Sequence, residues 1–342
     1  MSLLVRKFLV VSPVLLLLLL LSACQPAQTA REYEIQGKTM GTYYVVKFYA
    51  DQQPDLEALQ QELDTELELI NDLMSTYRPE SELMRFNLQQ TTESVTLTEQ
   101  TATVIAEAIR IGEQTAGVLD ITVGPLTELW GFGAQGRVIR APEPEQLDAV
   151  RQYVGLDKIE LNGLALRKID ARVAIDLSTI AKGYGVDRLA EILLSHGYER
   201  FMVDIGGDMR LGAAKPTGPW KIAVEKPVSH ERSVQRIIAL NDLAIATSGD
   251  YRNYFEENGI RYSHLLNPHT GHPIQHKTVS STVIHPAAIS ADGYATALNV
   301  LPAEEAIAFA NKYAIALLLV VKTEQGFEER YSDAFKPFLT VN

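Results

Sequence analysis

The sequence predicts an α+β fold of mixed, largely antiparallel sheets with helices packed against them. Short strand-like runs follow one another in hairpin-like succession and are mixed with long amphipathic stretches, instead of alternating regularly with helices. No internal repeat, low-complexity linker or shift in composition divides the folded part of the chain. We therefore expect one folded region made of two intertwined lobes.

The first elements follow from periodicity. Thr42–Tyr49 is rich in aromatic and β-branched residues, which predicts a strand. Apolar residues at three- and four-residue steps from Leu56 to Met74 predict an amphipathic helix. A second helix is expected over about 100–116, where Gly117 is well placed to end it. Short apolar runs over 158–176 predict further strands.

The second half continues the mixture. Residues 131–144 are expected to form a long loop interrupted by a short extended piece, and 182–196 a third helix with Gly197 after its end. One further helix is expected over about 291–311. Strands are expected near 200–205, 208–213, 220–225, 234–247, 279–284 and 315–321.

The N-terminus has the layout of a secretory signal. Two basic residues precede an apolar run from Phe8 to Leu21, which is shorter than the roughly 20 residues of a membrane span. The run ends in Leu21-Ser22-Ala23-Cys24, which resembles the lipobox of bacterial lipoproteins, where the cysteine is diacylated. The alternative is an uncleaved helix with a chance cysteine. We expect a signal peptide over 1–23, a tether over 24–32 after lipidated Cys24, and one domain over 33–342.

The composition excludes several classes of protein. Without residues 1–23 the chain has 319 residues, with 29 basic against 43 acidic ones, a net charge of −14. So acidic a surface argues against nucleic acid, whose binding depends on neutralising phosphates with Lys and Arg. Because Cys24 is the only cysteine, no internal disulfide is possible. The common dinucleotide, phosphate-loop, serine-hydrolase and zinc-protease motifs are missing.

The segment from Asp176 to Asp187 combines a strand end, small polar residues and a helix start. Helix N-termini attract anions, and Lys182 could add a full positive charge to a phosphate site. The alternative is that Asp176 or Ser178 merely caps the helix. Capping alone does not call for Lys182 and two nearby glycines, so binding is favoured.

Two other segments allow both a functional and a structural interpretation. Val203-Asp204-Ile205-Gly206-Gly207-Asp208 runs from a strand into a Gly-Gly turn, which lets a ligand approach closely or forms an ordinary hairpin. Asp292 and Thr296 lie four residues apart at a helix start and hence on one face. Their oxygen atoms suit Mg²⁺, although Asp292 could equally serve the helix dipole.

Four of the seven histidines lie close together, and they are His264, His269, His272 and His276. They could form a zinc site, or His264 could act as a general base. The alternative is a polar surface turn, which is favoured for the three histidines near Pro and Gly. His264 belongs to a strand-like stretch and is the candidate base.

Together these segments resemble the ApbE family of FAD:protein FMN transferases from about residue 33 to the C-terminus. Each match is weak alone, but their joint order and spacing are specific. The matching stretches are Met40-Gly41-Thr42, Met74-Ser75-Thr76-Tyr77, Ser81-Glu82-Leu83, Asp120 with Thr122-Val123-Gly124-Pro125-Leu126, Asp176 through Asp187, Val203 through Asp208, His264-Leu265-Leu266-Asn267-Pro268 with Thr270-Gly271, and Ala291-Asp292 with Ala295-Thr296-Ala297.

The resemblance implies roles for single residues. His264 matches a base for the acceptor hydroxyl, and Thr179, Asp292 and Thr296 match Mg²⁺ ligands, Asp292 being catalytic as well. The flavin site would lie between the two lobes. The residues implied to contact FAD are Met40, Tyr77, Leu119, Asp120, Ile121, Asp176, Lys182, Gly206, Gly207 and Ile274.

The implied reaction joins FMN from FAD to a Thr or Ser hydroxyl and releases AMP. Mg²⁺ and Lys182 would neutralise the pyrophosphate, while His264 would remove the hydroxyl proton. Ser178-Thr179 replaces a Gly-Gly common in the family, which leaves a backbone carbonyl as an alternative metal contact. Leu119 and Ile121 stand where Phe and Pro are common, which leaves the flavin packing open. Alternative functions are a Mg²⁺-dependent FAD pyrophosphatase, a non-catalytic flavin- or solute-binding lipoprotein, and a zinc lipoprotein.

The resemblance also implies partners and a location. The acceptors would be subunits of Na⁺-translocating NADH:quinone oxidoreductases or Rnf-type complexes. Gln25 after the cysteine allows export to the outer membrane, whereas such acceptors favour the inner one. We expect a periplasmic protein anchored by lipid to the inner membrane, where tethering raises its effective concentration near its targets.

Overall fold

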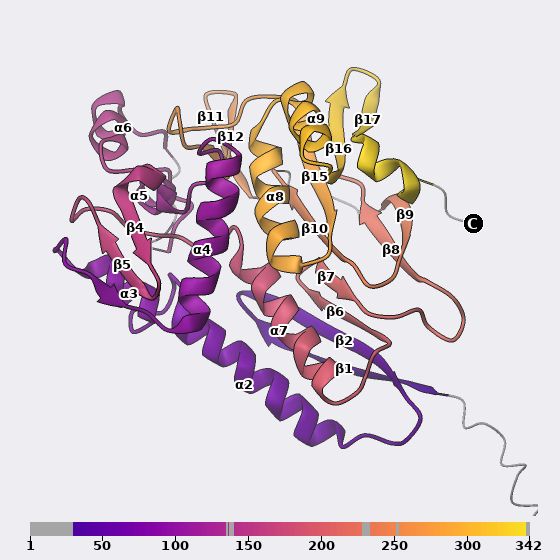
Figure 1. Ribbon diagram of the computed structural model, residues 1–342. Coiled ribbons are helices and arrows are strands. Elements are labelled where there is room, and N and C mark those ends of the chain that lie inside the picture. The colour runs from indigo at the N-terminus through magenta and orange to yellow at the C-terminus, as the bar shows by residue number, and fades with distance from the viewer. Residues whose placement is uncertain (1–29, 135, 137–139, 228–232, 251–252, 340–342) are drawn as a thin grey trace, which may run out of the picture.

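An eight-stranded antiparallel sheet forms the centre of the molecule (Figure 1). In the computed structural model, the described residues are 30–134, 136, 140–227, 233–250 and 253–339. Across the sheet lie β1 (Arg31–Thr39), β2 (Thr42–Ala50), β6 (Phe201–Ile205), β7 (Asp208–Leu211), β10 (Ala244–Gly249), β15 (Thr278–His285), β16 (Ala316–Thr323) and β17 (Gly326–Tyr331).

Helices cover one face of this sheet (Figure 1). They pack on the larger hydrophobic core, which they share with the inward side chains of the strands. Each Leu buried there contributes about 1.5–3 kcal/mol, so this packing is what holds the helices to the sheet. The helices are α2 (Leu56–Met74), α4 (Glu99–Gln114), α7 (Ala181–Ser195), α8 (Ala288–Val300) and α9 (Ala303–Lys312).

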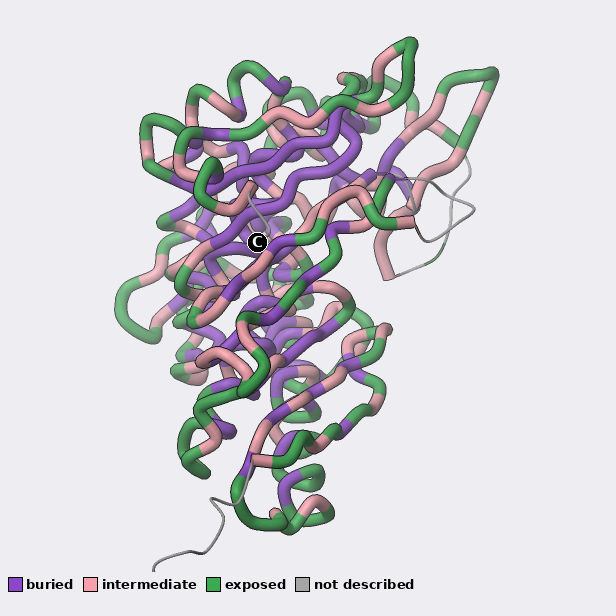
Figure 2. Tube along the Cα trace, turned by 90° about the vertical axis from the view of Figure 1, so that its right-hand side faces the viewer, coloured by how far each residue is buried: buried purple, intermediate pink, exposed green. Residues whose placement is uncertain are grey.

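The opposite face is covered by a hairpin of β8 (Trp220–Glu225) and β9 (Val234–Leu240) and by the 3₁₀ helix η3 (Asp333–Phe338). Side chains of β16 alternate between the two cores, with Leu317 and Leu319 on the helix side and Leu318 on the hairpin side. Figure 2 shows the result as a band of buried residues along the central strands, with exposed loops around it. Cover on both faces explains why β16 is a nearly continuous apolar run.

A smaller third core lies beside the main body. It joins Leu126, Trp130, Leu147 and Leu266, and the Trp130 indole N–H donates to the Gly271 carbonyl at 2.8 Å. Its elements are α5 (Gly124–Leu129), α6 (Pro144–Arg151), β11 (Tyr254–Glu257), β12 (Ile260–Ser263), β13 (Leu266–Asn267) and β14 (His272–Pro273). Between the two bodies lie α3 (Glu82–Leu88), the 3₁₀ helices η1 (Ile121–Val123) and η2 (Leu156–Lys158), and a small sheet of β3 (Val95–Thr96), β5 (Ala165–Lys168) and β4 (Ile159–Asn162).

The predicted class and most predicted elements are confirmed, including the strand that became β2 and the helices that became α2, α4 and α7. Three predictions were wrong. The strands expected over 158–176 are β4 and β5 and end at Lys168, so 169–176 belong to no strand. The helix expected over 291–311 is α8 and α9, because Leu301 is extended and Pro302, which lacks an N–H, starts the second helix. The strand expected over 234–247 is β9 and β10, separated by a turn in which Asp242 has a φ of 54°.

Two predictions near the N-terminus and in the long loop lie outside the described residues. These are the signal peptide with Cys24, and the extended piece expected within 131–144, of which 135 and 137–139 are not described. The first strand begins at Arg31, two residues before the expected domain start, and pairs there with Ala50. Within the described part of the chain, no helix is long and apolar enough to cross a membrane.

Candidate active site

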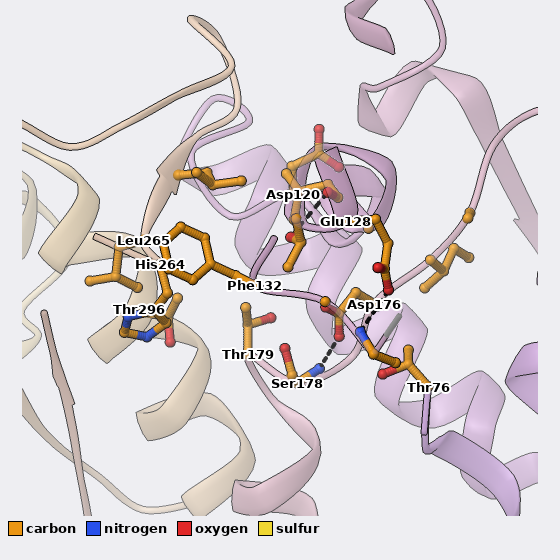
Figure 3. Close-up of a pocket in the computed structure, with 18 of the residues that line it drawn as sticks. Thr76, Asp120, Glu128, Phe132, Asp176, Ser178, Thr179, His264, Leu265 and Thr296 are labelled. Atoms are coloured by element: carbon orange, nitrogen blue, oxygen red, sulfur yellow. Dashed lines mark hydrogen bonds between the residues drawn. The ribbon is translucent and has the colours of Figure 1, made fainter. Parts of the chain in front are cut away.

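A cavity of about 1010 Å³ opens where the smaller third core meets the main body (Figure 3). Its wall combines the loop before α7, the first turns of α7 and α8, the end of β10 and the segment after β12. Ten of the fourteen predicted site residues in the described part line it. These are Tyr77, Leu119, Asp120, Asp176, Thr179, Lys182, Gly206, His264, Asp292 and Thr296.

The other four predicted residues do not line the cavity. Met40 is at the β1–β2 turn with a φ of 47°, and Gly207 is in the β6–β7 turn with a φ of 101°. The side chains of Ile121 and Ile274 belong to the main core. Their backbones nevertheless hold cavity residues, since the Ile121 carbonyl accepts the Asp176 N–H at 2.7 Å and the Ile274 N–H donates to the Leu265 carbonyl at 3.0 Å.

Lys182 lies in the first turn of α7 between two buried carboxylates. It is ion-paired with Asp208, at the start of β7, and its Nζ is 3.8 Å from Asp292 Oδ1 on α8. The second Asp292 oxygen accepts the Gly183 N–H at 3.0 Å, and Asp208 Oδ1 accepts the Thr247 N–H at 3.3 Å. We call Lys182, Asp208 and Asp292 the acid–lysine cluster.

The electrostatics of this cluster are dominated by excess negative charge. Burial, followed by the charge of Asp208, raises the pKa of Asp292 to about 7. Burial opposes the charge on Lys182, but Asp208 and Asp292 outweigh it and hold the Lys182 pKa above its usual range. Burial also raises the pKa of nearby Asp204 to about 6. Two carboxylates facing one ammonium leave room, electrostatically, for another cation.

Helices α7 and α8 touch through their backbones beside this cluster. A Cβ atom on Gly183 would lie only 2.3 Å from the Ala288 carbonyl oxygen, so no side chain fits between the helices there. Asp187 of α7 accepts the Ala288 N–H at 3.0 Å and the Ile289 N–H at 2.9 Å at the start of α8. The same carboxylate is ion-paired with Arg210 at 2.9 Å. These contacts fix Lys182 and Asp292 relative to each other.

The predicted metal ligands all line the cavity. Thr179 precedes α7 and Thr296 belongs to α8 (Figure 3), and Asp292 lies four residues, or about one helical turn, before Thr296. The Thr179 hydroxyl oxygen is buried and has no hydrogen-bond partner among the described residues, which is costly unless another group binds it. Together with the excess negative charge nearby, this oxygen set fits a hard cation such as Mg²⁺.

His264 follows β12 and also lines the cavity (Figure 3). Its Nδ1 is 3.1 Å from the Asn253 carbonyl oxygen, which can only accept, so Nδ1 carries the proton and Nε2 keeps its lone pair. Burial lowers the pKa of this imidazole, while the Asn253 hydrogen bond raises it less. Phe132 meets the ring edge-on at 6.4 Å between centroids. A neutral histidine held in one tautomer is suited to act as a base.

The rest of the cavity wall includes the carboxylates of Asp120, Glu128 and Asp176. The Asp120 carboxylate accepts the Thr122 N–H at 2.7 Å and its hydroxyl at 2.6 Å, and burial raises the Asp120 pKa. Tyr77 is 71% exposed at the cavity edge. Such an exposed ring over a deep cavity is free to stack on a planar ligand.

Sequence reasoning missed several residues that line or shape the cavity. Asn87, Glu128 and Phe132 line it, and Asp208 forms the ion pair with Lys182. Asp208 carried a signal, since it follows the Gly-Gly turn directly. Asn87 and Phe132 carried none, because their partners lie far away in the sequence.

The histidine cluster does not form a metal site in the described part of the chain. No group of three or more His, Cys, Asp or Glu side chains could hold a metal ion among those residues. His276 Nε2 is 3.0 Å from the Val300 carbonyl oxygen, and His269 and His272 are exposed. The zinc alternative is therefore wrong for these histidines. A site made of one carboxylate and two hydroxyls is a different kind of site from such a cluster.

The fold and the cavity define an antiparallel α+β protein whose cavity is lined by both a histidine held in one tautomer and the acid–lysine cluster. The family model described as "ApbE family" matches residues 40–319. The FAD:protein FMN transferases of Vibrio cholerae and Haemophilus influenzae are 48% and 43% identical, over 94% and 92% of this chain and 97% and 93% of theirs. The chain belongs to the ApbE family.

Solved structures agree with this assignment. The flavin transferase ApbE from Vibrio cholerae matches with a TM-score of 0.84 and 47% identity, covering 91% of this chain and 100% of that one. The flavinyl transferase ApbE from Pseudomonas stutzeri, in its apo form, matches with a TM-score of 0.84 and 35% identity, covering 92% and 98%.

Proposed function

We propose that this protein transfers FMN from FAD to a Thr or Ser hydroxyl of other proteins and releases AMP. Relatives of the same length and up to 48% identity are named for this activity. The observation that carries the proposal is one cavity lined by both a histidine held in one tautomer and the acid–lysine cluster. A phosphoryl transfer to a hydroxyl needs both groups.

The chemistry assigns the first role to His264. The acceptor oxygen attacks the phosphorus of the FMN half, the bond to the AMP half breaks, and the hydroxyl proton goes to His264 Nε2. Nδ1 is already committed to the Asn253 carbonyl, which keeps the lone pair on Nε2. Because burial lowers the His264 pKa, the base is neutral at physiological pH.

Lys182 and its carboxylate partners form the phosphate side. The ammonium stays charged because Asp208 and Asp292 hold its pKa high. We propose that Thr179, Asp292 and Thr296 hold Mg²⁺, since the Thr179 oxygen is buried without a partner among the described residues and the cluster has excess negative charge. When bound, Mg²⁺ would neutralise charge on the pyrophosphate.

The flavin half would occupy the part of the cavity beside Tyr77. Tyr77 offers an exposed ring there, and Leu119, Asp120 and Asp176 line the same wall. Gly206 lets a ligand approach the backbone closely, because its φ is 59° and no side chain projects from it. Met40, Ile121, Gly207 and Ile274 would act from behind this surface, two of them through the backbone hydrogen bonds described above.

Incubating the purified protein with FAD, Mg²⁺ and a fragment of an acceptor protein tests the proposal. We expect the fragment to gain the mass of FMN while AMP appears in solution. AMP and free FMN without a labelled fragment would instead indicate an FAD pyrophosphatase, and no AMP would indicate binding alone. Asp292→Asn should abolish turnover, whereas Asp333→Asn, at an exposed carboxylate paired with Lys336, should not.

The metal has its own test. Chelation should stop turnover and Mg²⁺ should restore it, with half-saturation shifted by Thr179→Ala and Thr296→Ala. Undiminished activity in metal-free buffer would contradict the metal assignment. Binding of Mg²⁺ to the protein without FAD, measured by calorimetry, gives a readout that does not depend on activity.

We also propose that the mature chain is anchored by lipid at Cys24 in the periplasm, most simply at the inner membrane. The support is the sequence pattern Leu21-Ser22-Ala23-Cys24 and the nature of the acceptors that the family resemblance implies, subunits of Na⁺-translocating NADH:quinone oxidoreductases or Rnf-type complexes. Intact-mass analysis should show a diacylated N-terminus that Cys24→Ser removes. Separation of the two membranes then decides between inner and outer attachment.

A further inference from the structure

The segment 173–177 carries two proposed site residues into position without belonging to any strand of the described sheets. It is extended, and it leads through Asp176 into the turn that holds Ser178 and Thr179 just before α7. On one side, the Asp176 N–H donates to the Ile121 carbonyl at 2.7 Å. Something else must fix its other side.

Asn87, in the last turn of α3, supplies that second side. Its side-chain Nδ2 donates to the Ile175 carbonyl at 2.8 Å, and its Oδ1 accepts the Ile175 N–H at 2.8 Å. One side chain thus satisfies both backbone groups of one residue, as a neighbouring strand would. Asn87 and Ile175 are 88 positions apart in the sequence, so the contact ties two distant segments together at the cavity wall.

Lys168, at the end of β5, holds Asn87 in turn. Its side chain is 1% exposed, and its Nζ donates to the carbonyl oxygens of Asn87 and Gln89, both at 2.9 Å. The ammonium also lies 5.0 Å from the centre of the Phe86 ring. A buried ammonium that binds the end of α3 through three groups fixes the backbone from which the Asn87 amide projects.

We propose that Asn87 is a positioning residue for FAD and metal binding, and that Lys168 locks it in place. Asn87 acts through the Ile175 backbone on Asp176 and Thr179, which follow Ile175 by one and four residues in the chain. The inference rests on the proposed roles of Asp176 and Thr179. It adds a residue pair, Asn87 and Lys168, that the sequence pattern did not suggest.

Substitutions at residue 87 test the proposal in two graded steps. Asn87→Ala removes both hydrogen bonds, while Asn87→Asp keeps the acceptor for the Ile175 N–H and loses the donor. We expect the dissociation constant for FAD and the half-saturation for Mg²⁺ to rise together, about tenfold in Asn87→Ala and less in Asn87→Asp. The kcat at saturating FAD and Mg²⁺ should fall much less, because His264 and Asp292 are untouched.

Hydrogen exchange gives a readout that needs neither FAD nor turnover. The Ile175 amide, protected by Asn87 Oδ1, should exchange faster in Asn87→Ala than in the parent protein. Lys168→Met, which keeps the apolar stem and removes the ammonium, should raise exchange in the same segment. Asn311→Ala, which removes one hydrogen bond to Asp333 far from the cavity, is the matched control and should change neither measurement.

The possible outcomes separate this inference from the proposed function. Unchanged exchange at Ile175 and unchanged FAD and Mg²⁺ affinities, with only a lower melting temperature, would overturn the positioning role. If Asn87→Ala does not fold, Asn87→Asp and Lys168→Met decide by the same measurements. A parent protein that binds FAD but labels no acceptor would contradict the transferase proposal and leave the affinity comparison intact.

Discussion

Two lysines only fourteen positions apart occupy opposite electrostatic surroundings. Lys182 lies between the carboxylates of Asp208 and Asp292, which hold its pKa above the usual range against the effect of burial. The buried Lys168 ammonium contacts carbonyl oxygens and an aromatic ring, and burial lowers its pKa to about 8. His264 resembles Lys168, because its ring also contacts a carbonyl oxygen and burial lowers its pKa.

The contrast distinguishes a charged group suited to ligand binding from groups whose hydrogen bonds hold the backbone. The Lys182 ammonium stays charged near the place where a phosphate would lie, and 32% of its side chain is exposed. The carbonyl-bound groups lose their charge more easily, so they serve as donors, acceptors or bases. Substitutions in the acid–lysine cluster and substitutions at the carbonyl-bound groups should therefore affect activity and stability differently in kind and in size.

The largest effect is expected from Lys182→Met. Removing the ammonium takes a full charge from the phosphate side, and we expect kcat/KM to fall about 10³-fold. The two carboxylates lose their partner as well, so stability should fall by about 3 kcal/mol or less, since Lys182 is partly exposed. Denaturant unfolding and initial rates of acceptor labelling measure the two losses.

A double variant sharpens that result. Adding Asp208→Asn to Lys182→Met removes the unpaired buried charge, so much of the lost stability should return while activity stays low. Recovery of activity together with stability would mean that Lys182 matters only for folding.

His264→Gln should lower kcat by about 10²- to 10⁴-fold, with little change in FAD binding. In the parent protein, kcat/KM should decline on the acid side as the base becomes protonated. Because burial lowers the His264 pKa, that decline should lie below about pH 6.5, the ordinary histidine value. Rates measured over a pH series would contradict this assignment if the decline persists in His264→Gln.

The Phe132→Ala variant tests whether the Phe132 ring shields His264 from water. The ring lies edge-on to His264 and packs on Phe255 at 5.6 Å, so removing it should admit water beside Nε2. We expect the ratio of free FMN to labelled acceptor to rise severalfold, about tenfold at most. Phe255→Ala disturbs the same aromatic pair without touching the cavity lining and provides the control. An equal product ratio in all three proteins would remove Phe132 from this role.

The smallest effect concerns Lys168 and pH. Its folded pKa of about 8 lies below the unfolded value near 10.5, so between these values the unfolded chain binds more protons. The stability of the parent relative to Lys168→Met should therefore rise with pH across that window, by up to about 1.4 kcal/mol per pH unit. Unfolding curves near pH 7, 8.5 and 10 measure the difference, and a flat or falling difference would contradict the buried-cation assignment.

Local patterns predicted much of this molecule. Helix α2 and strand β2 follow from periodicity and side-chain type, and the motif around Lys182 pointed to an anion site before any geometry was known. Short elements such as α3 were not predicted, because a helix of seven residues is too short to show a clear period of apolar and polar residues. The break at Pro302 could have been predicted from its missing N–H.

What the sequence could not provide is contact across long separations. The role of Asn87 depends on its contact with Ile175, 88 residues later. The role of Lys168 depends on carbonyl oxygens, which no side-chain pattern encodes. Likewise, Ile121 and Ile274 were assigned to the flavin wall, but their side chains belong to the core and their backbones face the site residues. Such roles depend on the fold and not on residue type.

The close contact at Gly183 has a consequence for how the site is spaced. Helices α7 and α8 can pack this closely because residue 183 has no side chain. Even a methyl group on residue 183 would collide with the Ala288 carbonyl. Gly183→Ala would keep every chemical group of the acid–lysine cluster but push Asp292 away from Lys182. The separation of Lys182 and Asp292 can thus be changed by a substitution at residue 183 without changing the chemical groups of the cluster.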